Sequence, residues 1–124
     1  MPATMRLLRP TVLIVDDHDE FRVSARALLE AEGFAVVGEA ADGAQAIEAV
    51  AALRPAVVLL DIQLPGRDGL AVAERIAAGP DPPAVVLISS RVAASYGPRL
   101  GRAAARGFIA KSELSGAALA GLLD

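Results

Sequence analysis

The chain has 124 residues, a formal net charge of −3, 54% hydrophobic residues and no cysteine. This length and composition predict one domain with an aliphatic core, and they exclude disulfides, thiolate metal sites and a cysteine nucleophile. The acidic balance predicts no general nucleic-acid contact, and no apolar stretch approaches the ~20 residues of a membrane span. We therefore expect no membrane contact and a cytoplasmic location.

The apolar runs and the breaks between them predict strands that alternate with helices. Short runs rich in Val and Ile are typical of buried strands, and apolar residues at helical spacing indicate amphipathic helices. In chain order, the sequence predicts a tail over 1–10, a strand over 12–16, a helix from Asp17 that stops at Gly33, a partly polar edge strand over 34–40, a helix from Asp42 to Arg54, a strand over 56–60, a helix capped by Asp68, a strand over 84–89, a short helix from Pro98, a strand over 107–110 and a final helix over about 113–123. This alternation predicts an α/β fold whose parallel sheet is covered on both faces and joined by right-handed crossovers.

Polar side chains follow the predicted strands at their carboxyl ends. Asp16 and Asp17 close the first strand, and Asp61 closes the strand over 56–60. Ser89 and Lys111 close the two later strands. Because ligand chemistry in open α/β sheets occurs at the carboxyl edge, we expect these five groups to meet in one site.

Three clustered carboxylates need a positive partner. Two like charges about 4 Å apart repel by roughly 4 kcal/mol at an effective dielectric of ~20. A hard divalent cation such as Mg²⁺ relieves this repulsion and accepts carboxylate, water and phosphate oxygens. Lys111 adds a compact positive charge and Ser89 adds a hydroxyl donor. A carboxylate in such a group can itself accept a phosphoryl group as an acyl phosphate.

Each of these residues also has an ordinary structural interpretation. An aspartate after a strand is often a turn residue or a helix cap. Ser89 alone is compatible with a satisfied loop hydroxyl, and Lys111 alone is compatible with a solvated surface lysine. The joint order of Asp-Asp, Asp, Ser and Lys, each at the end of its own strand, favours the phosphoryl site.

Four segments of the chain resemble the receiver domain of two-component response regulators. The matching segments are Val12–His18, Asp61–Leu70, Val86–Ser89 and Gly107–Lys111. The resemblance covers nearly the whole chain, about residues 11–123. It implies a flavodoxin-like (βα)5 fold, which is a doubly wound, five-stranded parallel sheet of order 2-1-3-4-5. We therefore expect residues 11–124 to form a receiver domain.

The resemblance also implies the metal and acceptor residues. Asp61 would be the phosphoacceptor. Asp16 and Asp17 would hold Mg²⁺ together with Asp61, and the backbone carbonyl of Gln63 would be a further ligand. The phosphoryl donor would be a sensor histidine kinase or a phosphotransfer protein. The domain would catalyse only its own Mg²⁺-dependent phosphorylation and dephosphorylation.

Three further residues are implied in the switch that follows phosphorylation. Ser89 would be the hydroxyl that follows the phosphoryl group, and Lys111 would pair with the phosphate. Phe108 takes the place of the aromatic residue whose rotamer reports the switch. The switched surface would lie around residues 90–123 and would bind an output partner or a second copy of the chain.

Two details resemble receivers that precede helix-turn-helix output domains. They are Asp-Asp-His at 16–18 and Gly-Phe-Ile-Ala-Lys at 107–111. The chain ends at Asp124, about where the last helix of a receiver should stop. Both a stand-alone receiver and the isolated receiver of a longer DNA-binding regulator therefore stay open.

The sequence departs from the family pattern in three places. Ser112 stands where many members have proline, and Ser89 replaces the commoner threonine. Gly97 and Pro98 interrupt the region of the fourth helix, because proline breaks a helix interior. We therefore expect a short or mobile fourth helix and an altered interaction surface.

Four other residues have less specific expectations. We expect a surface or capping role for His18 and a loop position for Tyr96, with an interface role as the alternative for Tyr96. Gln63 and Arg91 flank the pocket, and the resemblance implies that such positions tune the dephosphorylation rate.

Three other functions were weighed against the phosphorylation switch. A phosphatase of the haloacid dehalogenase type would want a second acid at Gln63 and a cap domain, which 124 residues do not accommodate. A nucleotide-binding module would want a glycine-rich turn after the first strand, where four acids would instead repel a pyrophosphate. The alternative that stays open is a phosphorylation-independent protein-binding module with a receiver fold.

Overall fold

A parallel β-sheet organises the molecule. The computed structural model describes residues 10–91 and 96–123, so nearly all of the predicted tail over 1–10 lies outside the described residues. Five strands pair in the order β2-β1-β3-β6-β7. They are β1 (Thr11–Val15), β2 (Ala35–Ala40), β3 (Val57–Asp61), β6 (Ala84–Ser89) and β7 (Gly107–Ala110), and all four pairings are parallel. Counted in chain order within this sheet, the order is 2-1-3-4-5, so the predicted flavodoxin-like fold is confirmed.

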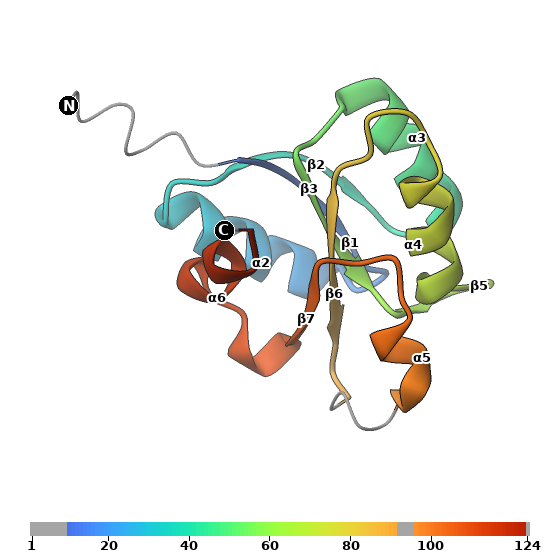
Figure 1. Cartoon of the computed structure of the whole chain (residues 1–124). Helices are drawn as coiled ribbons and strands as arrows, with labels where there is room; N and C mark the ends of the chain where they lie inside the picture. Colours follow the sequence, from blue (N-terminus) through green and yellow to red (C-terminus); the bar gives the residue numbers. More distant parts are fainter. Residues whose placement is uncertain (1–9, 92–95, 124) are drawn as a thin grey trace.

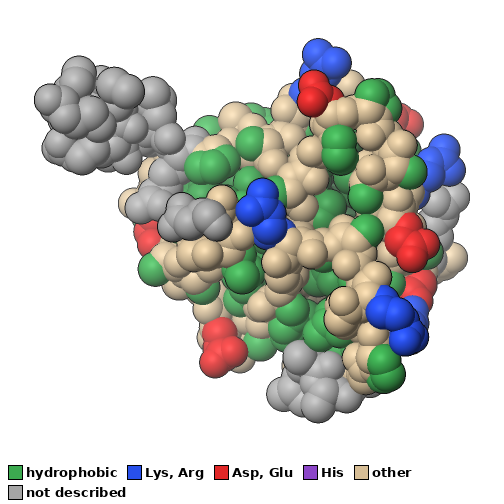
Figure 2. Space-filling view, in the orientation of Figure 1, with side chains coloured by type: hydrophobic (Ala, Val, Ile, Leu, Met, Phe, Trp, Pro, Cys, Tyr) green, Lys and Arg blue, Asp and Glu red, His purple; other side chains and the backbone are tan. Residues whose placement is uncertain are grey.

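Helices cover both faces of the sheet. Helices α2 (Asp19–Ala31) and α6 (Gly116–Leu123) lie together on one face, and α3 (Gly43–Leu53) and α4 (Gly69–Ala77) lie on the other (Figure 1). In the described part of the chain, no helix is long and apolar enough to span a membrane. On the face shown in Figure 2, acidic and basic side chains are interspersed.

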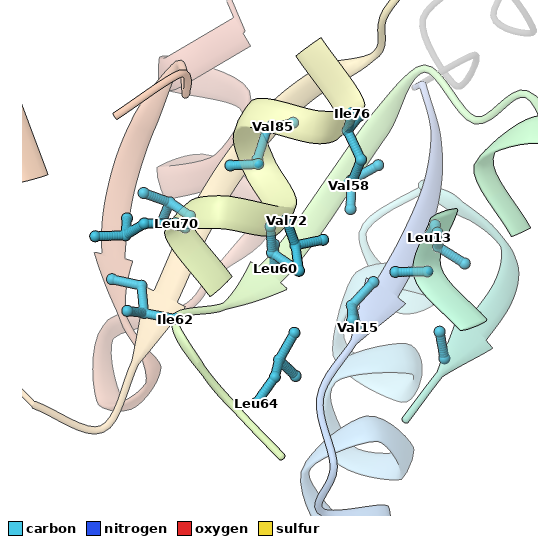
Figure 3. Close-up of a cluster of buried hydrophobic side chains, with 14 residues drawn as sticks. Leu13, Val15, Val58, Leu60, Ile62, Leu64, Leu70, Val72, Ile76 and Val85 are labelled. Carbon is cyan, nitrogen blue, oxygen red and sulfur yellow. The ribbon is translucent and has the colours of Figure 1, made fainter. Parts of the chain in front are cut away.

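Two layers of buried apolar side chains hold the helices to the sheet. The layer beneath α3 and α4 includes Leu13, Val15, Val58, Leu60, Ile62, Leu64, Leu70, Val72, Ile76 and Val85 (Figure 3). The opposite layer includes Val12, Ile14, Leu29, Leu59, Ile88 and Leu119. Successive side chains of a strand point to opposite faces, so the unbroken apolar runs of β1 and β3 supply both layers.

Side-chain caps fix where three helices begin. Asp42 Oδ1 accepts a hydrogen bond from Gln45 N at 2.8 Å at the start of α3. Asp68 Oδ1 accepts one from Leu70 N at 2.9 Å at the start of α4, as predicted. Ser115 Oγ accepts one from Ala118 N at 3.0 Å at the start of α6. Each cap satisfies a backbone donor that has no partner within its own helix.

The structure differs from the sequence predictions between the main strands. The predicted loop over 61–69 contains a small antiparallel hairpin of β4 (Gln63–Leu64) and β5 (Arg67–Asp68). The final helix begins at Gly116 and not near 113, because Lys111–Glu113 forms a 3₁₀ turn, η2.

The fourth helix of the receiver pattern is short, as predicted. It is α5 (Pro98–Gly101), which begins with Pro98 in its first turn. Residues 92–95, which also belong to the predicted fourth-helix region, lie outside the described residues.

Gly69 allows α4 to start against the backbone that follows β3. Its amide donates to Ile62 O at 2.7 Å. A Cβ added at this position would lie 2.2 Å from Asp61 O and 2.6 Å from Ile62 Cα. Because these atoms belong to the backbone beside the Asp61 side chain, only glycine fits here without a shift of the chain.

We predict that Gly69→Ala lowers the free energy of unfolding by about 1–3 kcal/mol, the usual range for overpacking. Urea unfolding measures this loss. The matched control is Gly121→Ala in α6, where an added Cβ meets no atom within 4 Å. The control should gain about 0.5–1 kcal/mol from helix propensity. Equal stability of the two variants would contradict the close approach at Gly69.

Candidate functional site

The carboxyl edge of the sheet gathers the side chains that the sequence singled out. Asp61 ends β3 and pairs in register with Ile88 of β6. Ser89 ends β6 and pairs with Ala110 of β7, which directly precedes Lys111. Asp16 follows β1, and its amide donates to Ala40 O of β2 at 3.0 Å. The side chains of Asp16, Asp61 and Ser89 are the buried polar groups among the described residues.

Three aspartates form a compact oxygen cluster at this edge. Ligand atoms of Asp16, Asp17, Asp61 and His18 all lie within 4.8 Å of one another. Asp16 Oδ2 is buried and accepts no well-directed hydrogen bond from the described residues, although Lys111 Nζ lies 2.5 Å away. Carboxylate oxygens are the ligands that hard divalent cations prefer, so the donor set fits such an ion.

Lys111 joins two of the carboxylates. Its Nζ lies 2.5 Å from Asp16 Oδ2 and 3.2 Å from Asp61 Oδ2. The ammonium also lies 4.6 Å from the centroid of the Phe21 ring, close enough for a cation–π interaction. The position of the Phe21 ring beside Lys111 was not predicted from the sequence.

Burial and the ion pairs shift the pKa values of this group in different directions. For Asp61, burial is the largest influence and holds its pKa above the ordinary value, against the hydrogen bond from Gln63 and the charge of Lys111. Burial also raises the pKa of Asp16, but the contacts with Lys111 and His18 outweigh it and hold this pKa below the ordinary value. Burial disfavours the Lys111 cation, yet Asp16 and Asp61 raise its pKa above the ordinary value.

Neighbouring residues fix the position of Asp16. His18 N donates to Asp16 Oδ1 at 2.8 Å, and His18 Nδ1 lies 2.9 Å from the same oxygen. Arg22 Nη1 donates to Asp16 O at 2.6 Å, while its Nε donates to Glu39 at 3.0 Å. Arg22 thereby ties the end of β1 to β2. The His18 ring is exposed, and its amide and ring contacts orient Asp16 in addition to the predicted surface role.

The β4–β5 hairpin orients Asp61. The backbone N–H of Gln63 donates to Asp61 Oδ1 at 2.9 Å, so Gln63 contacts the predicted acceptor through its main chain. Ile62 N donates to Ile88 O at 3.0 Å, which extends the pairing of β3 with β6 past Asp61. One Asp61 oxygen therefore contacts the Gln63 amide, and the other faces Lys111.

The Ser89 hydroxyl has two neighbours that lie outside the acid cluster. Ser89 Oγ accepts a hydrogen bond from Arg91 N at 3.0 Å and is in close hydrogen-bond contact with Tyr96 Oη. The Tyr96 ring lies 6.4 Å from the Phe108 ring, centroid to centroid, at an angle of 57°. The contact between Tyr96 and Ser89 was not predicted from the sequence, which indicated a loop position for Tyr96.

Comparison with known proteins agrees with this arrangement. The sequence profile of the response regulator receiver domain matches residues 12–120. A candidate transcriptional regulator of Pseudomonas aeruginosa is 39% identical over 102 residues, which cover 82% of this chain and 49% of that protein. The chain spans about half the length of the curated relatives that it matches first.

Solved structures of receiver domains superpose on the chain. The signal receiver domain of NarL from Mycobacterium tuberculosis is 36% identical, with a TM-score of 0.79 over 93% of this chain and 97% of that one. A LuxR-family two-component response regulator from Aurantimonas is 27% identical, with a TM-score of 0.82 over 94% of this chain and 86% of that one.

We predict that Lys111→Met lowers the free energy of unfolding at neutral pH by about 3 kcal/mol, because it leaves two buried carboxylates without their cation. The pKa of Asp16 is lowered from 3.8, so the contribution of its ion pair is complete above pH 3.8 and is lost as the pH falls through the lowered value. The stability difference between the variant and the wild type should therefore narrow in acid. Urea unfolding across this pH range measures it.

The control for this prediction is Arg75→Met. Arg75 is exposed and has no ion-pair partner among the described residues. Its replacement removes the same formal charge and should change stability by less than about 0.5 kcal/mol. A pH-independent loss in Lys111→Met would contradict the ion-pair origin of its effect.

Proposed function

We propose a phosphorylation-dependent switch as the function of this chain, which belongs to the response regulator receiver domain family of two-component systems. The observation that carries the proposal is one buried carboxylate, Asp61, which belongs to the acid cluster and also contacts Lys111. This arrangement gives a candidate acceptor carboxylate both a metal-type ligand set and a neighbouring cation. Asp61 is the proposed acceptor.

The transfer step is a displacement at phosphorus. A carboxylate oxygen of Asp61 forms a bond to the phosphorus of a phosphohistidine while the bond from phosphorus to the histidine nitrogen breaks. The electron pair stays on that nitrogen, which takes up a proton. The product is an acyl phosphate on Asp61, and the step needs chiefly positioning and charge stabilisation.

The residues of the site have different proposed roles in this transfer. Asp16, Asp17 and the backbone carbonyl of Gln63 are the proposed Mg²⁺ ligands together with Asp61. Bound Mg²⁺ supplies positive charge that screens the acids and the incoming phosphoryl oxygens. Lys111 lies 3.2 Å from Asp61 Oδ2 and is the proposed partner of a phosphoryl oxygen.

The proposed response to phosphorylation begins at Ser89 and Lys111. The phosphoryl group carries up to about two negative charges and three strong acceptor oxygens. Because it replaces the charge of the Asp61 carboxylate, the net gain is about one negative charge. Ser89 moves toward these oxygens, and Phe108 then turns inward. The surface around residues 90–123 would then change between two conformations. To shift the ratio of their populations from 1:99 to 99:1, phosphorylation must stabilise the second conformation over the first by about 5.5 kcal/mol.

The proposed donor is a sensor histidine kinase or a phosphotransfer protein, and the location is the cytoplasm. The surface around residues 90–123 is the proposed contact for an output partner or a second copy of the chain. The chain spans about half of relatives that include candidate transcription regulators, so a DNA-binding output domain is one proposed destination of the signal.

We predict that incubation with Mg²⁺ and a small acyl-phosphate donor adds the mass of one phosphoryl group to the wild type. Asp61→Asn should show no gain, because the amide is not a nucleophilic carboxylate. Intact-mass spectrometry measures both. The control is Asp42→Asn, which keeps the cap of α3 and lies outside the acid cluster, and it should be labelled like the wild type. Labelling of Asp61→Asn at the wild-type level would refute Asp61 as the acceptor.

We further predict that millimolar Mg²⁺ raises the melting temperature of the wild type, because an ion that binds only the native acid cluster stabilises it. The rise should disappear in Asp16→Asn and persist in Asp42→Asn. Differential scanning calorimetry with and without Mg²⁺ measures the shift. An equal rise in all three proteins would mean that the ion binds elsewhere.

A further inference from the structure

We infer that Tyr96 is a positioning residue that holds the Ser89 hydroxyl in the unphosphorylated chain and so competes with the phosphoryl group for it. The inference rests on the proposed function, since it takes Ser89 as the hydroxyl that responds to a phosphoryl group on Asp61. Tyr96 lies outside the acid cluster, but its bond to Ser89 would influence the equilibrium between the unphosphorylated and the phosphorylated conformations.

Two of the three hydrogen-bonding positions of the Ser89 hydroxyl have partners in this structure. A serine hydroxyl has one donor proton and two acceptor lone pairs. Ser89 Oγ accepts from Arg91 N at 3.0 Å and contacts Tyr96 Oη. Ser89 is fully buried, with 0% of its surface exposed, so water cannot replace a lost partner at low cost. A rotation of Ser89 toward Asp61 must therefore break the bond to Tyr96.

The position of Tyr96 is defined by a ring contact and by the turn that follows it. It packs against Phe108 with the rings at 57°, an arrangement typical of favourable aromatic pairs. It is followed by Gly97, which has a positive φ of 58°, and by Pro98, which fixes the start of α5. The Gly97–Pro98 pair, which departs from the family pattern, thus forms the turn beside Tyr96 that allows its hydroxyl to contact Ser89.

The same segment is also attached to the start of α4. Arg99 of α5 forms an ion pair with Asp68, the residue that caps α4. Residues 96–101 are therefore bound both to the hydroxyl at the end of β6 and to the start of α4. Release of Tyr96 by phosphorylation would free one of these attachments and leave space beside Phe108.

The decisive variant is Tyr96→Phe, which removes the hydroxyl and keeps the ring on Phe108. A net hydrogen bond of ordinary strength corresponds to about a fivefold change in an equilibrium. With Mg²⁺ present, trifluoroberyllate, an analogue of the phosphoryl group, should half-saturate Tyr96→Phe at about one fifth of the wild-type concentration. Amide chemical shifts during an NMR titration measure this midpoint.

A double-mutant cycle with Ser89→Ala separates positioning from a structural effect. Tyr96→Phe should change the midpoint in the wild-type background and leave it unchanged in the Ser89→Ala background. An unchanged midpoint in the single variant would overturn the inference. An equal shift in both backgrounds would overturn it too, because Tyr96 would then act without Ser89.

A second readout does not require phosphoryl chemistry. Tyr96 is the single tyrosine and the chain has no tryptophan, so tyrosine fluorescence reports this residue alone. In the absence of ligand, Ser89→Ala should change that fluorescence, and identical spectra would overturn the contact. A spectral change without any trifluoroberyllate binding by the wild type would overturn the proposed function, and with it the competition, while the contact itself stands.

Discussion

The contact of Lys111 with Asp16 and Asp61 is the interaction on which the site depends. Two buried carboxylates from adjacent strands repel each other, and Lys111 lies within 2.5 Å of one and 3.2 Å of the other. Its charge favours the ionised form of both acids at an edge where burial disfavours charge. A phosphoryl group would bring more negative charge to this site, and a further cation would then be needed to balance it.

The sheet makes this contact possible across long stretches of sequence. Asp16, Asp61 and Lys111 follow β1, β3 and β7, and the parallel pairing brings the ends of these strands to one edge. The two apolar layers fix the register of the strands, because a slip by one residue would turn each side chain to the opposite face. Stability of the core and geometry of the site are thus set by the same strand pairings.

Local signals explain why most of the fold was predictable. Apart from Thr11 at the start of β1 and Ser89 at the end of β6, these two strands are apolar, and Asp42 and Asp68 cap helices as their positions indicated. The β4–β5 hairpin and the 3₁₀ turn after β7 were missed, because each is two or three residues long and has no periodic pattern. The contact of Tyr96 with Ser89 could not be predicted, since it depends on how α5 docks beside the end of β6.

Asp61 is the proposed carrier of the phosphoryl group. To test this, the full chain is phosphorylated with Mg²⁺ and a small acyl-phosphate donor and reduced with borohydride, and its peptides are sequenced by mass spectrometry. Reduction converts an aspartyl phosphate to homoserine, so we expect homoserine at position 61 and at no other aspartate. Homoserine at another position, with Asp61 unmodified, would contradict it.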